Sequence, residues 1–293
     1  MSFELTLPPN YPKSDILAFH ARDTEALAER VGPDFIQKGF VVETKPVVLE
    51  IRFASRKAVC RIDADGPLSS NGRASIKESA RKMLGLLIEE AAFERSVKKD
   101  KLLGPLVKRQ NGLRIPQVAT VFEALSWAVI GQQIHLNFAI ALRRTFICLS
   151  GRKHSSGLFC FPDAEAVSRL DREELGRNQF SHAKAETLVR IAELVTSGEL
   201  ELEPKEPHSP ETISASLLAI KGIGPWTVNY TLLRGYGFAD ASLHGDSAVR
   251  SALQKLSGKK YDAGQTERLL KKYAPHRSLA AAHLWNSLKK QSD

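Results

Sequence analysis

The sequence predicts a mainly helical protein that begins with an α+β domain, and three observations predict this class. Alternating valine and isoleucine patterns, typical of β-strands, fall within about the first 95 residues. After Pro116, apolar residues recur at the spacing of amphipathic helices. Gly222 and Gly224 separate two such segments, which predicts a tight turn between consecutive helices.

The N-terminal part combines both kinds of element. Its patterns predict strands over residues 38–53 and 58–63 and helices over residues 14–28 and 75–93. Proline and glycine then become frequent around Pro105 and over residues 112–116, so we place a domain boundary in this region.

The remainder of the chain is predicted to be helical. Thr120 and Glu123 match a capping box at the start of one helix, and a second amphipathic helix follows Gly131 and ends near Gly151. Further helices are expected over residues 163–170, 172–177, 183–197, 209–220, 265–273 and 279–290. Pro225 suits the first position of the helix that follows the glycine pair.

The chain is basic. Its 293 residues carry a formal net charge of +9, and the excess lies in residues 96–114, net +5, and residues 250–293, net +7. Such segments attract polyanions, most commonly nucleic acid, although a lysine-rich face can also serve solubility alone. No secretory signal or membrane-spanning apolar run is seen, and the three cysteines match no zinc or iron–sulfur pattern. We therefore expect a cytoplasmic, nucleoid-associated protein.

The glycine pair lies in K-G-I-G-P-W-T-V-N-Y, residues 221–230. Thr227 replaces the third glycine of a dinucleotide-binding fingerprint, and no P-loop motif follows. A helix N-terminus offers free N–H groups and the positive end of the helix dipole. Because Gly222 and Gly224 lack a Cβ atom and Lys221 adds charge, this turn suits a DNA phosphate, without reading base sequence. The alternative is an ordinary helix–helix corner.

Asp246 is the candidate catalytic residue. It precedes S-A-V-R-S-A-L, a predicted helix, where the helix dipole favours an ionised carboxylate. It lies 22 residues after Gly224, enough for one helix and a return loop, so both motifs are expected on one side of the molecule. A carboxylate beside a bound phosphate suits chemistry on the nucleotide's sugar. The alternative is a plain helix N-cap.

These motifs resemble the helix–hairpin–helix superfamily of base-excision DNA glycosylases, and within it the 3-methyladenine DNA glycosylases of type II. Four further blocks fit in order over nearly the whole chain: Y-P-K-S-D-I-L-A-F-H-A-R, G-L-R-I-P with F-E-A-L-S-W-A-V-I-G-Q-Q, C-F-P-D-A-E-A-V and R-S-L-A-A-A-H-L-W. The resemblance implies a helix–hairpin–helix glycosylase fold with an α+β domain over residues 1–95. It also implies a helical subdomain of residues 96–119 plus 239–293, which carries the catalytic aspartate, and a second of residues 120–238, which carries the hairpin.

The resemblance also assigns roles by position. Asp246 matches the catalytic aspartate, and Gln133 matches the side chain that fills the gap left by a flipped nucleotide. The base-pocket aromatic residues correspond to Trp226, Tyr230, Trp285 and Phe19. Lys221, Gly222 and Gly224 match the DNA-binding hairpin, and the carbonyls of Leu218, Ile220 and Ile223 match a monovalent cation site. From the residues alone, core packing remains open for the tryptophans, and a solvent-facing side chain remains open for Gln133.

The implied activity is removal of alkylated purines, of the 3-methyladenine and 7-methylguanine type, from double-stranded DNA. Enzymes that act on a base in a duplex flip it out first, and an aromatic face favours a cationic alkylated base by ~0.5–2 kcal/mol. Trp226 stands where relatives that also cut the backbone carry a nucleophilic lysine, so we expect a monofunctional enzyme. Relatives with an iron–sulfur cluster need four closely spaced cysteines near the C-terminus, and none follows Cys160, so we expect no such cluster. We also expect a monomer that requires no cofactor. The alternatives are a glycosylase for deaminated or oxidised purines and a non-catalytic DNA-binding protein.

The sequence departs from the family pattern in three places. Lys221 stands where proline is common, and His244 and Gly245 precede Asp246 where the type II enzymes have a second acid. An insertion near residues 257–261 separates Asp246 from Trp285. These departures bear on the substrate range and on the placement of Trp285.

Overall fold

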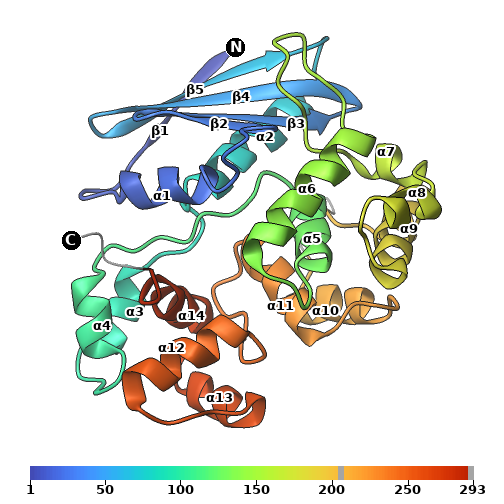
Figure 1. The fold of residues 1–293 in the computed structure, drawn as a ribbon. Coiled ribbons are helices and arrows are strands. Elements are labelled where there is room, and N and C mark those ends of the chain that lie inside the picture. The colour runs from blue at the N-terminus through green and yellow to red at the C-terminus, as the bar shows by residue number, and fades with distance from the viewer. Residues whose placement is uncertain (204–207, 290–293) are drawn as a thin grey trace.

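The computed structural model describes residues 1–203 and 208–289, in which a β-sheet packs beside a larger body of helices (Figure 1). The sheet has five antiparallel strands in the order β1-β5-β4-β3-β2. The strands are β1 (Ser2–Thr6), β2 (Glu29–Val31), β3 (Phe35–Val42), β4 (Lys45–Ala54) and β5 (Lys57–Ala64). Buried and exposed residues alternate along β5, so one of its faces is covered and the other is open to solvent.

Two helices accompany the sheet, α1 (Lys13–His20) and α2 (Ser70–Met83). Ile16 of α1 and Ile76 of α2 are fully buried in one apolar cluster with Ile36, Leu49 and Ile51 of the sheet. The predicted α+β domain is therefore confirmed, and its core lies between the two helices and the sheet.

Several predicted boundaries in this domain are wrong. Residues 38–53 hold two strands, because Glu43 and Thr44 adopt left-handed φ values of 50° and 64° and join β3 to β4 in a hairpin. The predicted helix 14–28 ends at His20, and the Asp23 carboxylate accepts a hydrogen bond from the backbone N–H of Glu25 in the turn that follows. The predicted helix 75–93 ends at Met83, shortly before the left-handed Gly85.

The rest of the described chain is helical, as predicted. The helices are α3 (Ala91–Ser96), α4 (Gly104–Arg109), α5 (Val121–Ile130), α6 (Leu136–Ser150), α7 (Ala164–Ser168), α8 (Arg172–Arg177), α9 (His182–Ser197), α10 (Pro210–Leu218), α11 (Pro225–Arg234), α12 (Ser247–Ser257), α13 (Ala263–Leu270), a 3-10 turn (Lys271–Tyr273) and α14 (Arg277–Asn286). One apolar core runs through them. The predicted end of the last helix at Lys290 lies outside the described residues. The division of the helical part into two subdomains stays a prediction.

The predicted capping box is half correct. The Thr120 hydroxyl accepts a hydrogen bond from the backbone N–H of Glu123. The Glu123 carboxylate does not reach back to the start of the helix, because it pairs with Lys38 and Arg143 instead. A complete capping box begins α13, between Asp262 and Gln265.

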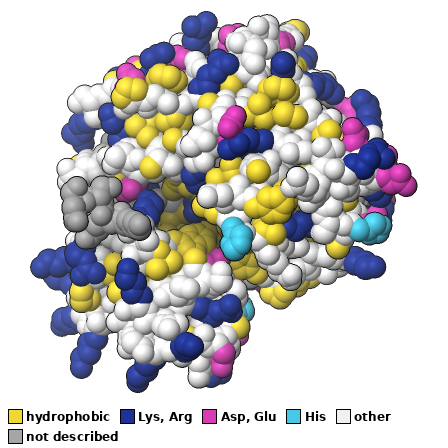
Figure 2. All heavy atoms as spheres, in the orientation of Figure 1, with side chains coloured by type: hydrophobic (Ala, Val, Ile, Leu, Met, Phe, Trp, Pro, Cys, Tyr) yellow, Lys and Arg dark blue, Asp and Glu magenta, His cyan; other side chains and the backbone are white. Residues whose placement is uncertain are grey.

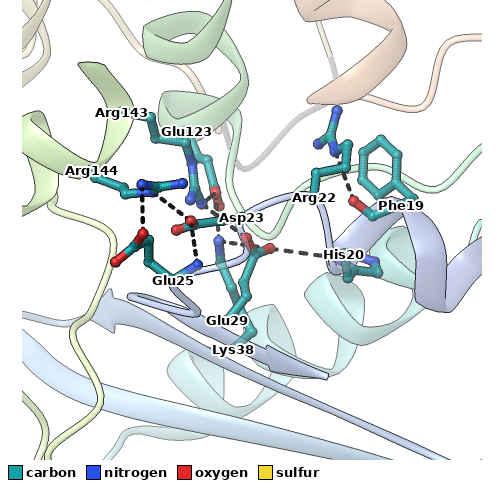
Figure 3. A network of polar contacts seen from close by, with 10 residues as sticks. All are labelled: Phe19, His20, Arg22, Asp23, Glu25, Glu29, Lys38, Glu123, Arg143 and Arg144. Carbon is teal, nitrogen blue, oxygen red and sulfur yellow. Dashed lines mark hydrogen bonds and ion pairs between the residues drawn. The ribbon is translucent and has the colours of Figure 1, made fainter. Parts of the chain in front are cut away.

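A buried ion network joins the sheet domain to the helices (Figure 3). Lys38 Nζ of β3 lies 3.3 Å from a Glu29 oxygen, and Arg143 of α6 lies 3.1 Å from Glu29 and 2.8 Å from Glu123 of α5. Burial alone would raise the pKa of Glu29, but the charges of Lys38 and Arg143 hold it well below its usual range. Since buried charges are tolerated only when paired, this network fixes β2 and β3 against α5 and α6.

Within residues 1–203 and 208–289, none of the helices has the length and apolar character needed to cross a lipid bilayer.

Candidate active site

Asp246 is the N-cap of α12, and its carboxylate accepts four hydrogen bonds. Oδ1 accepts the backbone N–H groups of Ala248 and Val249, both at 2.9 Å, and the indole N–H of Trp285 at 3.0 Å. Oδ2 accepts the indole N–H of Trp226 at 2.9 Å. The N-cap interpretation is therefore correct, but the two indole donors go beyond it. They come from α11 and α14 and fix the carboxylate between three helices.

Two of the predicted aromatic residues remain partly accessible, and a third is buried between them. Trp226 and Trp285 are half-buried, and their ring centroids lie 5.2 and 6.4 Å from the Tyr230 centroid. Tyr230 is only 8% exposed, and its hydroxyl accepts the indole N–H of Trp127 at 2.9 Å. Core packing is thus the immediate role of Tyr230, whereas the two tryptophans keep exposed surface beside Asp246.

A cavity of about 200 Å³ adjoins this cluster. It is lined by α1, α11, α14 and residues 113–116, and Figure 2 shows a hollow with hydrophobic side chains at its floor on this face. Phe19 and Trp285 line it, whereas Trp226, Tyr230 and Asp246 do not. The Trp285 indole lines the cavity and donates to the Asp246 carboxylate, so a single side chain connects the carboxylate to the cavity wall.

Sequence reasoning missed two arginines in this cavity, Arg22 and Arg234. The guanidinium carbon of Arg22 lies 3.9 Å from the Phe19 ring centroid, and that of Arg234 lies 4.6 Å from Phe19 and 5.3 Å from Trp285. Burial lowers the pKa of Arg234 to about 10, which leaves it protonated at neutral pH. Helical spacing could have indicated Arg234, because it follows Tyr230 by four residues on α11 and therefore lies on the same helix face.

The hairpin between α10 and α11 uses its two glycines differently. Gly222 has φ of 93°, and a Cβ atom there would lie 2.1 Å from the Thr187 hydroxyl oxygen, so the fold itself requires glycine. Gly224 is the N-cap of α11, and apart from its two chain neighbours no atom of the described residues lies within 4 Å of the place a Cβ would take. Lys221 and Gly222 are exposed. The first turn of α11 thus presents its backbone to open space.

The turn between α5 and α6 lies against this hairpin. Gln132 Nε2 donates to the Gly222 carbonyl and to the Thr227 hydroxyl, both at 3.0 Å. The next residue, Gln133, is exposed and has φ of 55°, a left-handed conformation that non-glycine residues rarely adopt. Gln133 therefore projects from a turn that Gln132 ties to the hairpin. Strained backbone of this kind is concentrated at functional sites.

The backbone carbonyls of Leu218, Ile220 and Ile223 have the donor chemistry of a cation site. Carbonyl oxygens suit hard cations such as alkali and alkaline-earth ions. The Ile220 carbonyl accepts the Ile223 N–H at 3.1 Å, which leaves its second lone pair for coordination. His244 is engaged in its own loop, where Nδ1 lies 3.0 Å from the Ser242 hydroxyl.

The structure thus places a glycine hairpin between two helices, an exposed glutamine beside that hairpin, and an aspartate held by two indoles, as in the predicted helix–hairpin–helix arrangement. The family model described as "HhH-GPD superfamily base excision DNA repair protein" matches residues 126–276, and the AlkA N-terminal domain model matches residues 2–120. The chain therefore belongs to the HhH-GPD superfamily of base excision DNA repair proteins.

The chain is also similar in sequence and in structure to known DNA glycosylases. The chain is 28% identical over 242 residues to the DNA-3-methyladenine glycosylase of Bacillus subtilis, covering 81% of this chain and 80% of that one. It is 28% identical over 185 residues to DNA-3-methyladenine glycosylase 2 of Escherichia coli, covering 62% and 63%. The solved 3-methyladenine DNA-glycosylase of Archaeoglobus fulgidus superposes with a TM-score of 0.81 over 97% of both chains at 21% identity, which supports the fold.

Proposed function

We propose that the protein is a monofunctional DNA glycosylase that flips alkylated purines, of the 3-methyladenine and 7-methylguanine type, out of double-stranded DNA and hydrolyses the N-glycosidic bond in base excision repair. The observation that carries this proposal is the Asp246 carboxylate, which two indole N–H groups hold beside a cavity of about 200 Å³. Family membership and the names of the relatives support the same reaction class.

The reaction breaks the bond between the base nitrogen and the sugar carbon C1′, and the bonding electrons leave with the base. Positive charge then develops on the sugar, where a fixed carboxylate stabilises it without reorganisation. Asp246 Oδ1 already accepts three N–H groups and Oδ2 only one. Oδ2 therefore keeps acceptor capacity for the sugar or for the water that attacks C1′ and passes a proton to the carboxylate.

DNA binding is proposed for the hairpin and its neighbours. The open N-terminus of α11 at Gly224 and the charge of Lys221 suit a phosphate, and Gln133 suits the gap left by the flipped nucleotide. A monovalent cation on the three hairpin carbonyls would bring a further positive charge to this phosphate. Two solved relatives were determined with DNA, an 8-oxoguanine glycosylase/lyase of Clostridium acetobutylicum and a 3-methyladenine DNA glycosylase of Schizosaccharomyces pombe. We propose that the protein acts on DNA as a monomer in the cytoplasm.

The absence of lyase activity is proposed from Trp226. It lies two residues after Gly224, and an indole nitrogen cannot form a Schiff base with the sugar. Lys289 lines the cavity, but its ammonium group pairs with Asp15 at 3.3 Å. Borohydride trapping on an abasic duplex tests this proposal, because a covalent protein–DNA adduct would show that an amine attacks the sugar.

The test of the function is a panel of duplexes, each with one lesion, incubated with the wild type and with Asp246→Asn. Alkali then converts each abasic site into a strand break that is measured on a gel. We expect methylpurine release by the wild type, at least 100-fold slower release by Asp246→Asn, and equal duplex binding by both. A wild type that binds duplex and releases no base would instead indicate a non-catalytic DNA-binding protein. Release confined to 8-oxoguanine or hypoxanthine would indicate the alternative glycosylase class.

A further inference from the structure

The turn that leads into Asp246 carries an anchored histidine. The backbone N–H of Asp246 donates to the Leu243 carbonyl at 3.0 Å, which closes a turn with His244 and Gly245 at its centre. His244 Nδ1 lies 3.0 Å from the hydroxyl oxygen of Ser242, a residue that is 8% exposed. Nε2 makes no hydrogen bond to the residues that the structure describes, and the side chain is half-buried. The ring is therefore fixed through one nitrogen, and the other nitrogen is free for a ligand.

Helix α11 holds this turn in place. Asn229 Oδ1 accepts the backbone N–H of Ser242 at 2.7 Å, and Asn229 Nδ2 donates to the Pro225 carbonyl at 2.9 Å. A Cβ atom at Gly245 would lie 3.8 Å from the Cβ atom of Trp226. The turn therefore packs against the first turn of α11, immediately after the glycine hairpin.

His244 lies outside the cavity proposed for the base. Residues 242–246 do not line that cavity, which Trp285 connects to the Asp246 carboxylate. They lie instead between this carboxylate and the first turn of α11. The carboxylate is proposed to act on the sugar, and the first turn of α11 is proposed to bind the DNA backbone. The group that joins a sugar to the rest of its strand is a phosphate, so a phosphate is the group expected beside His244.

The imidazole of His244 suits a phosphate oxygen. A neutral imidazole carries its proton on one nitrogen, and when the Ser242 hydroxyl donates to Nδ1, the proton is on Nε2, which is then a donor. Hydrogen bonds to an ionised acceptor are stronger than those between neutral groups. Among residues 1–203 and 208–289, no carboxylate oxygen lies within 4.0 Å of this ring to compete for the donor. Asp246 is also the only acidic residue of the segment 241–247.

We propose that His244 Nε2 binds a phosphate that flanks the flipped nucleotide and thereby positions its sugar beside Asp246. This inference rests on the proposed glycosylase function and adds a contact to it. His244 transfers no proton and breaks no bond. It is a positioning residue, which holds the strand on the backbone side while the base occupies the cavity.

The experiment measures binding to duplexes in which tetrahydrofuran, an abasic-site analogue with no base to release, replaces the lesion nucleotide. In three modified duplexes, one uncharged methylphosphonate replaces the phosphate 5′ to the analogue, the phosphate 3′ to it, or a phosphate at the end of the duplex. The variants are His244→Ala and His244→Lys. His208→Ala is the matched control, because His208 is also exposed but lies at the end of α10 that is farther from the hairpin. A thermal melt confirms that each variant is folded.

We expect His244→Ala to bind the unmodified duplex about tenfold more weakly or worse, because a hydrogen bond to a charged group is lost. One of the two flanking methylphosphonates should abolish the difference between wild type and His244→Ala, whereas the terminal one should preserve it. His244→Lys should keep most of the affinity, since an ammonium group also donates to phosphate. His208→Ala should bind as the wild type does. Equal binding of the unmodified duplex by His244→Ala and wild type would overturn the proposal, and so would a difference that survives both flanking methylphosphonates.

Base release from a 7-methylguanine duplex, measured under single-turnover conditions, separates this inference from the proposed function. A phosphate contact that depends on His244 in the analogue duplex supports the inference even if the wild type releases no base. Normal release by the wild type, together with unchanged binding by His244→Ala, refutes the inference alone. If His244→Ala binds the analogue duplex normally but releases base more slowly, the histidine acts in proton transfer, and the phosphate assignment is wrong.

Discussion

Trp226→Phe tests how the Asp246 carboxylate is held. The two oxygens are not equivalent, because Oδ1 accepts three N–H groups and Oδ2 accepts only the Trp226 indole N–H at 2.9 Å. Phenylalanine keeps an aromatic ring beside Tyr230 but removes the donor. The carboxylate then stays anchored through Oδ1, while Oδ2, the oxygen that we propose to be reactive, loses its one hydrogen-bond donor.

The size of the expected rate loss follows from the negative charge of the carboxylate that accepts the hydrogen bond. A hydrogen bond to a charged group is worth about 1.5–3 kcal/mol, and each 1.36 kcal/mol at the transition state is a factor of ten in rate. We expect single-turnover base release by Trp226→Phe to fall about 10- to 100-fold. Duplex binding should stay unchanged, because the hairpin backbone is untouched.

Trp285→Phe is the matched control, because it removes a donor of the same type from the other oxygen. Oδ1 keeps the Ala248 and Val249 N–H groups after this change, so we expect a loss of less than tenfold. Which of the two variants loses more activity decides whether Oδ2 is the reactive oxygen. If Trp285→Phe loses more activity than Trp226→Phe, or if Trp226→Phe stays within threefold of wild type, the assignment of Oδ2 as the reactive oxygen is wrong.

Three further predictions concern the hairpin, the adjacent turn and α14. Gly224→Ala should weaken duplex binding and leave the melting temperature within about 2 °C of the wild-type value. Gly222→Ala should lower the melting temperature, because the added Cβ clashes with Thr187. Equal duplex binding by Gly224→Ala and the wild type would show that no phosphate approaches Gly224. Gln133→Ala should slow base release more on a paired lesion than on one in a mismatch, which flips at lower cost, and equal slowing would refute the gap-filling role. Burial lowers the pKa of His283 to about 4, so stability should fall by about 3 kcal/mol as pH drops from about 6.5 to about 4, since the unfolded state binds the proton there. His283→Asn should flatten the denaturant-unfolding profile over that window, and an unchanged slope would contradict this assignment.

Local chemistry made much of the helical part predictable. Ser209, Asp246 and Asp262 accept backbone N–H groups at the starts of their helices, and each is a residue type that favours an N-cap. The turn at Gly222 was predictable for the same reason, because a left-handed φ favours glycine. Such features depend on residues within a few positions of each other, so the sequence alone contains the required information.

The missed features depend on contacts between distant segments. Glu123 looks like the second half of a capping box, but two cations 85 and 20 residues away along the chain draw its carboxylate into the ion network. In the sequence, Arg22 and Arg234 resemble solvated residues at helix ends. In the structure, both guanidinium groups stack on the Phe19 ring of α1. The family resemblance assigned Trp226 and Trp285 to the base pocket, but no sequence pattern indicated that they donate to different oxygens of one carboxylate.

The ion network explains how the sheet domain contributes to the cavity. Phe19 and Arg22 come from the N-terminal domain, whereas Arg234 and Trp285 come from helices more than 200 residues later in the chain. The stacking of Arg234 on Phe19 at 4.6 Å crosses between the two parts, so it is sensitive to small shifts of one part against the other. Buried ion pairs are geometrically specific because a displaced partner leaves a charge without compensation. Asp23 follows Arg22 directly and Glu29 lies a few residues later, and both bind arginines of α6, so the network fixes the segment that carries Phe19 and Arg22 against the helical part.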